Sequence, residues 1–110
     1  MTGKEYLNRI KKINTQMRNK GFELKELQEN RLPCGIILEA IDRLDAEKRK
    51  IIRNIEQLPE AEYDVLHKVY VQYKTLQEVA ADRDISYSLA ATIHGRALKS
   101  LENIINNAQQ

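Results

Sequence analysis

Apolar residues recur at alternating steps of four and three over the first 58 positions, and this spacing constrains the fold more than any other feature. Such steps align side chains along one stripe of an α-helix, the seam of a heptad repeat. One seam is predicted through residues 3–31 and another through 36–58, with Lys20 and Lys48 each at one seam position. The apolar members are Tyr6, Ile10, Ile13, Met17, Leu24, Leu27, Ile37, Ile41, Leu44, Ile51, Ile55 and Leu58.

The segment "NRLPCG" (30–35) separates the two repeats. Pro33 disfavours a helical conformation at Leu32, and Gly35 allows the chain to turn. Two heptad helices joined by so short a turn are expected to fold back as an antiparallel hairpin. A lone hairpin has a thin core, so we expect a partner helix pair, in the form of a homodimer.

A third helix is predicted from Pro59 to about Tyr73. Pro59 ends the second helix and can serve as the first residue of the next. Glu60 and Glu62 then lie in the first turn, where the helix dipole favours carboxylates. The expected apolar face of this helix consists of Leu66, Val69, Tyr70 and Tyr73.

The stretch from Thr75 to Leu101 has the spacing of a helix-turn-helix. Thr75 and Glu78 form a capping box before "LQEVAAD", and Ser86 is a suitable N-cap for the last helix. Small residues at 80 and 81 suit a helix crossing, and Ile85 can anchor the turn. The inner face of the last helix would hold Ala90, Ile93, Ala97, Leu98, Leu101 and Ile105. A plain three-helix bundle also fits this spacing.

These patterns predict an all-α fold with two parts. Residues 1–58 form a long helical, coiled-coil-like hairpin for dimerisation or partner binding. Residues 59–110 form a three-helix module containing the helix-turn-helix, with DNA binding as its expected role.

The residues "YDVLHKVYVQYKTLQEVAADRDISYSLAATIHGRALKSL" (63–101) resemble the sigma-70-type region 4 module, the promoter-reading domain of bacterial sigma factors. The matching features are the "L…VY" helix, "TLQEVA" and "GRALKSL". With "KEYLNRI" at the start and "HGRAL" near the end, residues 3–104 also resemble small phage and prophage proteins of Gram-positive bacteria. Relatives of that family include late transcriptional regulators of the ArpU and RinA type.

This resemblance implies a phage-encoded transcriptional regulator and a set of DNA-facing positions. Carried over position by position, Tyr87, Ser88, Ala91, Thr92 and Arg96 lie where such modules face DNA. We expect Tyr87, Ser88, Ala91 and Thr92 to face bases, whereas the residues expected to hold the backbone are Thr75, Ser86, Arg96 and Lys99. Leu89, Ala90 and Ala91 stand where sigma-like modules usually carry arginine or another long polar residue. Ala91 and Thr92 can still contact a thymine methyl group. Gly95 is expected to pack closely against a neighbouring helix, and His94 to be a neutral packing residue.

The charge distribution complicates a DNA-binding role. The chain carries a net charge of +2, but residues 1–59 hold 13 Lys/Arg and 9 Asp/Glu, whereas residues 60–110 hold 5 and 7. The helix-turn-helix half is therefore the acidic one. In the first helix Lys4, Lys11, Arg18 and Lys25 recur every seven residues, which makes either a phosphate- or partner-binding stripe or an ordinary solvated coiled-coil face.

Enzymatic chemistry is not expected. His67 and His94 have no neighbouring ligand pair at metal spacing, Cys34 has no nearby histidine in sequence, and no glycine-rich phosphate loop is present. We therefore predict neither cofactor nor metal. No apolar run approaches about 18 residues, so a membrane role is not expected. The single cysteine suits the bacterial cytoplasm, which is the expected location.

Two functions fit the sequence. In the first, the last helix enters the major groove of double-stranded DNA and the hairpin joins two modules or docks on RNA polymerase. In the second, the hairpin binds a host or phage protein and the sigma-like module is a decoy or docking surface. The uncharged, mostly small residues of "SLAAT" (88–92) and the acidic second half favour the second function. The motif spacing and the resemblance favour the first.

Overall fold

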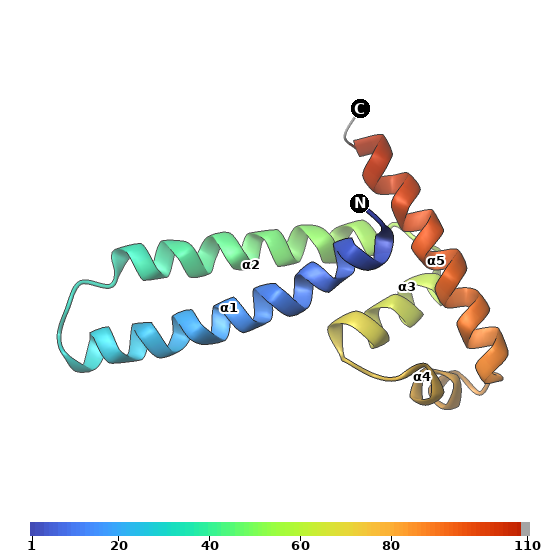
Figure 1. The fold of residues 1–110 in the computed structure, drawn as a ribbon, viewed down its shortest axis with the longest axis horizontal. Coiled ribbons are helices and arrows are strands. Elements are labelled where there is room, and N and C mark those ends of the chain that lie inside the picture. Colours follow the sequence, from blue (N-terminus) through green and yellow to red (C-terminus); the bar gives the residue numbers. More distant parts are fainter. Residues whose placement is uncertain (109–110) are drawn as a thin grey trace.

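The computed structural model describes residues 1–108, and every regular element within them is helical (Figure 1). The predicted all-α class is confirmed. The elements, in chain order, are α1 (Gly3–Glu29), α2 (Gly35–Ile55), α3 (Glu60–Leu66), the single π-helical turn η1 (His67–Val71), α4 (Leu76–Arg83) and α5 (Tyr87–Ala108).

Helices α1 and α2 lie side by side as the predicted antiparallel hairpin (Figure 1). At the start of α1, Thr2 Oγ1 accepts a hydrogen bond from the Glu5 N–H at 3.1 Å. At its end, Arg31 adopts the left-handed conformation with φ 54°, and the Leu32 N–H donates to the Leu27 carbonyl at 2.9 Å. This closure, followed directly by Pro33, ends the helix where the sequence indicated.

The second helix ends earlier than predicted, at Ile55 rather than at Leu58. A proline disfavours helical geometry in the residue before it, so the chain leaves the helix ahead of Pro59. Leu58 is nevertheless buried, at 8% exposure. The prediction that Pro59 is the first residue of the third helix is also wrong. With φ −52° and ψ 152°, Pro59 is the extended N-cap residue that precedes Glu60.

The third helix is likewise shorter than predicted, because α3 passes into the wider turn η1. The Gln72 N–H donates to the His67 carbonyl at 3.1 Å, a five-residue spacing, and Tyr73 then adopts φ 58°. The prediction that Tyr73 belongs to the apolar face is wrong, since its side chain is 54% exposed. Its hydroxyl instead accepts a hydrogen bond from Asn14 Nδ2 of α1 at 2.5 Å.

One hydrophobic core joins the hairpin to the C-terminal part of the chain. Helix α5 and the α3–η1 segment close over the half of the hairpin that lies nearest the N-terminus. The buried members of this cluster are Leu7, Ile10, Ile13, Ile51, Ile55, Leu58, Leu66, Tyr70, Ala97, Leu101 and Ile105. Each fully buried large aliphatic side chain contributes about 1.5–3 kcal/mol, so this junction is the main source of tertiary stability.

The start of α1 is pressed against the middle of α5. A Cβ atom on Gly3 would lie 2.7 Å from the Leu98 carbonyl oxygen, so a larger residue does not fit without movement of the backbone. The Gly3 N–H donates to Glu102 Oε1 at 2.8 Å. Gly3 therefore fixes how closely the hairpin approaches α5.

Candidate nucleic-acid interface

Helix α4 begins with the capping box that the sequence predicts. Thr75 Oγ1 accepts from the Glu78 N–H at 3.2 Å, and Glu78 Oε1 accepts from the Thr75 N–H at 3.1 Å. The Thr75 hydroxyl also donates to Glu78 Oε1. Both donors of Thr75 are thus occupied by Glu78, so contact with a phosphate would require the glutamate to move away.

The turn between α4 and α5 is closed by backbone hydrogen bonds. Asp84 adopts the left-handed conformation with φ 55°, and the Ile85 N–H donates to the Ala80 carbonyl at 2.9 Å. Ala80 is buried at the crossing, whereas Ala81 is exposed and Ile85 is half-buried. Ser86 caps α5 as predicted, because its Oγ accepts from the Leu89 N–H at 3.1 Å. Its hydroxyl proton remains available to a phosphate.

Helix α5 has an inner face that packs on the core and an outer face that is uncovered. Ala90, Ala97 and Leu101 are fully buried, and Ile93 and Leu98 are half-buried. Among the carried-over positions, Ala91 is half-buried and the exposed ones are Thr75, Ser86, Tyr87, Ser88, Thr92, Arg96 and Lys99. The Thr92 hydroxyl donates to the Ser88 carbonyl at 3.0 Å, which leaves its oxygen able to accept.

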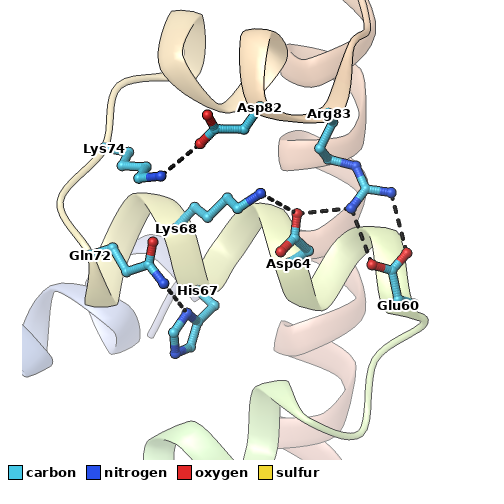
Figure 2. Close-up of polar contacts among 8 residues, drawn as sticks. All are labelled: Glu60, Asp64, His67, Lys68, Gln72, Lys74, Asp82 and Arg83. Atoms are coloured by element: carbon cyan, nitrogen blue, oxygen red, sulfur yellow. Dashed lines mark hydrogen bonds and ion pairs between the residues drawn. The ribbon is translucent and has the colours of Figure 1, made fainter.

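A network of ion pairs ties α4 to the α3–η1 segment (Figure 2). Arg83, at the end of α4, donates to Asp64 Oδ2 at 2.8 Å and to both carboxylate oxygens of Glu60 at 3.2 Å. Lys68 also reaches Asp64 Oδ2, at 3.0 Å. Next to Arg83, Asp82 Oδ2 accepts a hydrogen bond from Lys74 Nζ at 2.7 Å.

The network shifts the ionisation of its members. Burial pushes the pKa of Asp64 upward, but the hydrogen bonds from Arg83 and Lys68 outweigh it and hold that pKa below its usual value. The hydrogen bonds to Glu60 and Asp64 raise the pKa of Arg83. The Asp82 hydrogen bond likewise raises the pKa of Lys74, and the pKa of Asp82 is lowered in return. Asp64, Lys74, Asp82 and Arg83 therefore stay charged at neutral pH.

The network decides where positive charge remains free in the acidic half of the chain. Residues 60–110 contain five cations. Lys68, Lys74 and Arg83 are paired with carboxylates. Among the described residues, Arg96 and Lys99 make no such pair, and both are exposed on the outer face of α5. The module therefore presents its unpaired positive charge on one side of one helix.

Two predictions about the middle of α5 have different outcomes. The expectation that Gly95 packs against a neighbouring helix is wrong, because it is exposed and nothing lies within 4 Å of where its Cβ would be. His94 is half-buried, with Nε2 at 2.9 Å from the Tyr70 hydroxyl. Burial, together with the charge of Lys4, lowers the pKa of His94, so the imidazole is neutral at pH 7 as expected.

The apolar seam and the basic stripe predicted on the hairpin differ in burial. The proximal members of the seam, Ile10, Ile13, Ile51 and Ile55, are buried within the chain, and Tyr6 Oη accepts a hydrogen bond from Asn54 Nδ2 at 2.6 Å. The half-buried members are Tyr6, Met17, Leu24, Leu27, Ile37, Ile41 and Leu44. The basic stripe of Lys4, Lys11, Arg18 and Lys25 is exposed along its whole length.

The described residues form neither a metal-binding cluster nor a membrane-spanning helix. Within residues 1–108, no group of three or more His, Cys, Asp or Glu side chains is arranged to hold a metal ion. No helix of that part combines the length and apolar character needed to cross a bilayer. Cys34 is a free, half-buried thiol whose Sγ lies 3.3 Å from the Leu32 carbonyl in the hairpin turn.

Sequence reasoning missed the contacts that join distant segments. Arg83 and Glu60 are 23 positions apart, and Tyr70 and His94 are 24 apart, so no local pattern pairs them. The four-residue spacing of Asp64 and Lys68 was the one available signal, since such pairs meet on a helix surface.

Comparison with known families places the C-terminal part. The family model described as "Sigma-70, region 4" matches residues 54–103, which include α3, η1, α4 and most of α5. Residues 54–103 are a sigma region 4-like helix-turn-helix. The match covers less than half of the chain and leaves α1 and nearly all of α2 outside it. Searches of curated proteins and of solved structures give no match.

Proposed function

We propose that this protein is a DNA-binding transcriptional regulator that reads duplex DNA with the outer face of α5. The observation that carries the proposal is the exposed, unpaired charge of Arg96 and Lys99 beside exposed Ser88 and Thr92. These side chains lie on the second helix of a helix-turn-helix, the element that such motifs insert into the major groove. The match to sigma region 4 supports the same use.

Each residue of the outer face has a distinct proposed role. Arg96 and Lys99 hold the phosphate backbone, and the Ser86 hydroxyl donates to a phosphate at the helix start. Ser88 and Thr92 face base edges, Tyr87 reaches a base edge or a phosphate, and the methyl groups of Ala91 and Thr92 meet thymine methyls. With so few phosphate contacts, one module binds weakly and loses affinity steeply as salt rises.

A phage or prophage origin is the finer part of the proposal. It is supported by the likeness of "KEYLNRI" (4–10) and "HGRAL" (94–98) to small late transcriptional regulators of the ArpU and RinA type. In that setting the regulated promoter belongs to the phage, and the protein works in the bacterial cytoplasm. The expected targets are therefore intergenic duplexes of the phage genome.

Selection from random duplexes followed by fluorescence anisotropy tests the proposal without knowledge of the operator. We expect a common sequence to be enriched and to bind more tightly than scrambled DNA. Arg96→Ala should weaken binding on the order of tenfold and reduce its salt dependence. Arg43→Ala, which removes an equal charge from the exposed surface of the hairpin, is the matched control and should bind like the parent.

The outcomes separate clearly. Enrichment of a sequence whose binding is sensitive to Arg96 and not to Arg43 supports α5 as the reader. Binding that Arg96→Ala and Tyr87→Ala both leave unchanged contradicts that assignment, even if DNA is bound by another surface.

A second candidate function is docking on RNA polymerase or another protein without reading DNA. One observation favours it: three of the five cations of residues 60–110 are neutralised by Asp64, Asp82 and Glu60, so the module offers DNA little positive charge. Binding of purified RNA polymerase by the chain, combined with no measurable affinity for any duplex at low salt, would favour this function over the first.

A further inference from the structure

The chain exposes more surface than a compact monomer of its mass does, and half of its hairpin extends beyond the hydrophobic core. A folded monomer of 12.8 kDa is expected to expose about 6,300 Å², whereas this chain exposes 7345 Å². Its radius of gyration is 17.0 Å, against about 13 Å for a compact domain of this length. The excess area, about 1,000 Å², matches the roughly 800 Å² that each partner buries in a standard interface.

One face of α1 shows which side of the outer hairpin the C-terminal part leaves uncovered. Leu7, Lys11, Asn14, Arg18 and Lys25 follow steps of four, three, four and seven, so they lie on one face of the helix. The C-terminal part contacts the start of this face: Leu7 is in the core, Asn14 bonds to Tyr73, and the exposed Lys11 borders a notch beside Tyr70 and Lys74. Arg18 and Lys25 continue this face past the covered region and are exposed.

An edge of α2 lies on the same side of the hairpin as Arg18 and Lys25. Leu38, Asp42 and Asp45 are spaced by four and three, and Leu38 is 47% exposed. The other side of the hairpin is marked by the ion pair of Arg9 with Glu47 and by a groove between Lys20, Glu23, Ala40 and Arg43. Helix geometry turns Leu38 and Asp45 away from that side, toward the side of Arg18 and Lys25.

The charges on this side complement one another. Arg18 and Lys25 are positive on α1, whereas Asp42 and Asp45 are negative on α2. Asp45 is bonded to Arg49 of its own helix, but Arg18, Lys25 and Asp42 have no side-chain partner among the described residues. A two-fold symmetric contact presents the same patch twice, so α1 of each copy would face α2 of the other and opposite charges would meet twice. Nucleic acid would be repelled by the carboxylates.

We propose that this side of the outer hairpin, formed by Arg18, Lys25, Leu38 and Asp42, binds a second copy of the chain to form a four-helix bundle. The contact covers the half-buried part of the heptad seam from the side and adds the helix pair that a lone hairpin lacks. Helix α5 stands at the opposite end of the molecule from the hairpin turn (Figure 1), so its outer face stays uncovered in the pair.

The inference stands on the hairpin alone and does not require DNA binding. Where the proposed function also holds, it gives each particle two α5 helices. Two linked modules bind one DNA with far higher avidity than one module does, which offsets the few phosphate contacts of each.

Light scattering with two matched variants tests the contact. The parent chain at micromolar concentration should have twice the mass of 12.8 kDa. Leu38→Lys should raise the dimer dissociation constant on the order of thirtyfold or more, the effect of losing a buried apolar anchor. Ile36→Lys is the control: Ile36 is 81% exposed and shares the opposite edge with Ala40 and Arg43, so it should not change the mass.

A charge exchange tests whether the occupant is a second copy. Arg18→Glu/Lys25→Glu and Asp42→Lys should each be largely monomeric while keeping a parental helical circular dichroism signal. An equal mixture of the two proteins should recover the dimer, because each variant supplies the charge that the other lacks.

Each result decides the proposal without reference to DNA. A parent dimer that Leu38→Lys weakens and Ile36→Lys does not, together with recovery in the mixture, supports it. A parent mass of 12.8 kDa, equal effects of the two lysine substitutions, or a mixture that stays monomeric would overturn it. A monomer that nevertheless binds RNA polymerase through this side would assign the surface to that partner instead.

Discussion

The inner and outer halves of the hairpin carry the same heptad seam but differ in burial. Ile10, Ile13, Ile51 and Ile55 are between 0% and 2% exposed, whereas seam residues farther out, such as Leu24, are only half-buried. The difference comes from α5 and the α3–η1 segment, which cover the inner half and end before the outer one. A heptad repeat therefore predicts which face of a helix is apolar, but it does not predict which other segment packs against that face.

Alanine substitutions in the two halves should have unequal costs. Ile13→Ala removes a fully buried side chain and should lower the free energy of unfolding by about 2–5 kcal/mol. Leu24→Ala, at a half-buried position, should cost roughly 1 kcal/mol. Chemical denaturation in the Leu38→Lys background, which we expect to be monomeric, measures both. Equal losses would mean that the outer half is covered within one chain.

Two glycines extend the same contrast between covered and uncovered positions. Gly3→Ala places a methyl group 2.7 Å from the Leu98 carbonyl and should destabilise the fold by about 1–3 kcal/mol. Gly95→Ala adds a methyl group to open space within a helix and should stabilise it by about 1 kcal/mol. Thermal melts of the two variants should therefore move in opposite directions, and a shift of the same sign in both would contradict the close approach of α1 to α5.

The ion network of the covering segment should matter more than a surface pair on the hairpin. Arg83→Ala leaves Glu60 and Asp64 without their shared partner and should cost about 1–2 kcal/mol, less than a fully buried pair would. Arg49→Ala removes an exposed i,i+4 pair with Asp45 and should cost about 0.5 kcal/mol or less. Urea titrations compare the two, and indistinguishable midpoints would show that the network is dispensable.

The smallest effect is expected from His94, at the junction of hairpin and module. Its folded-state pKa lies below the unfolded value of 6.5, so the unfolded chain binds the proton more readily. This contribution to stability is therefore complete above pH 6.5 and declines as the pH falls below it. Melting temperatures between pH 7 and 5 should decline less in His94→Gln, which can still bond to Tyr70. Identical pH profiles would contradict the burial of the imidazole.

Local features of the fold could be predicted from sequence, because their determinants are neighbours in the chain. The hairpin follows from the heptads and Pro33, and the start of α4 follows from Thr75 and Glu78. The prediction for Gly95 failed because nothing in a helix sequence shows whether another segment lies opposite a given residue. Tyr73 was wrongly assigned to the apolar face because the wide turn η1 ends at Val71 and Tyr73 takes φ 58° beyond it, an early helix end that periodicity does not reveal.

The candidate interface likewise has features that the sequence predicts and features that only the three-dimensional structure shows. The resemblance named positions along α5, and their exposure could be checked only in three dimensions. Within the described part of the module, Arg96 and Lys99 are the cations left without a carboxylate partner, and the pairing of Lys74 with Asp82 and of Arg83 with Glu60 and Asp64 depends on contacts between separate segments. Net charge by region therefore underestimated how strongly positive charge is concentrated on one helix face.

Mapping the DNA-contacting surface by nuclear magnetic resonance tests the central claim most directly. Titration of the labelled protein with a mixed-sequence duplex at low salt should perturb the backbone amides of Ser86 to Lys99, strongest on the outer face at Ser88, Thr92 and Arg96. Amides of the hairpin turn around Pro33 should not move. Perturbation concentrated on the hairpin, with α5 unchanged, would contradict the claim that α5 is the DNA reader.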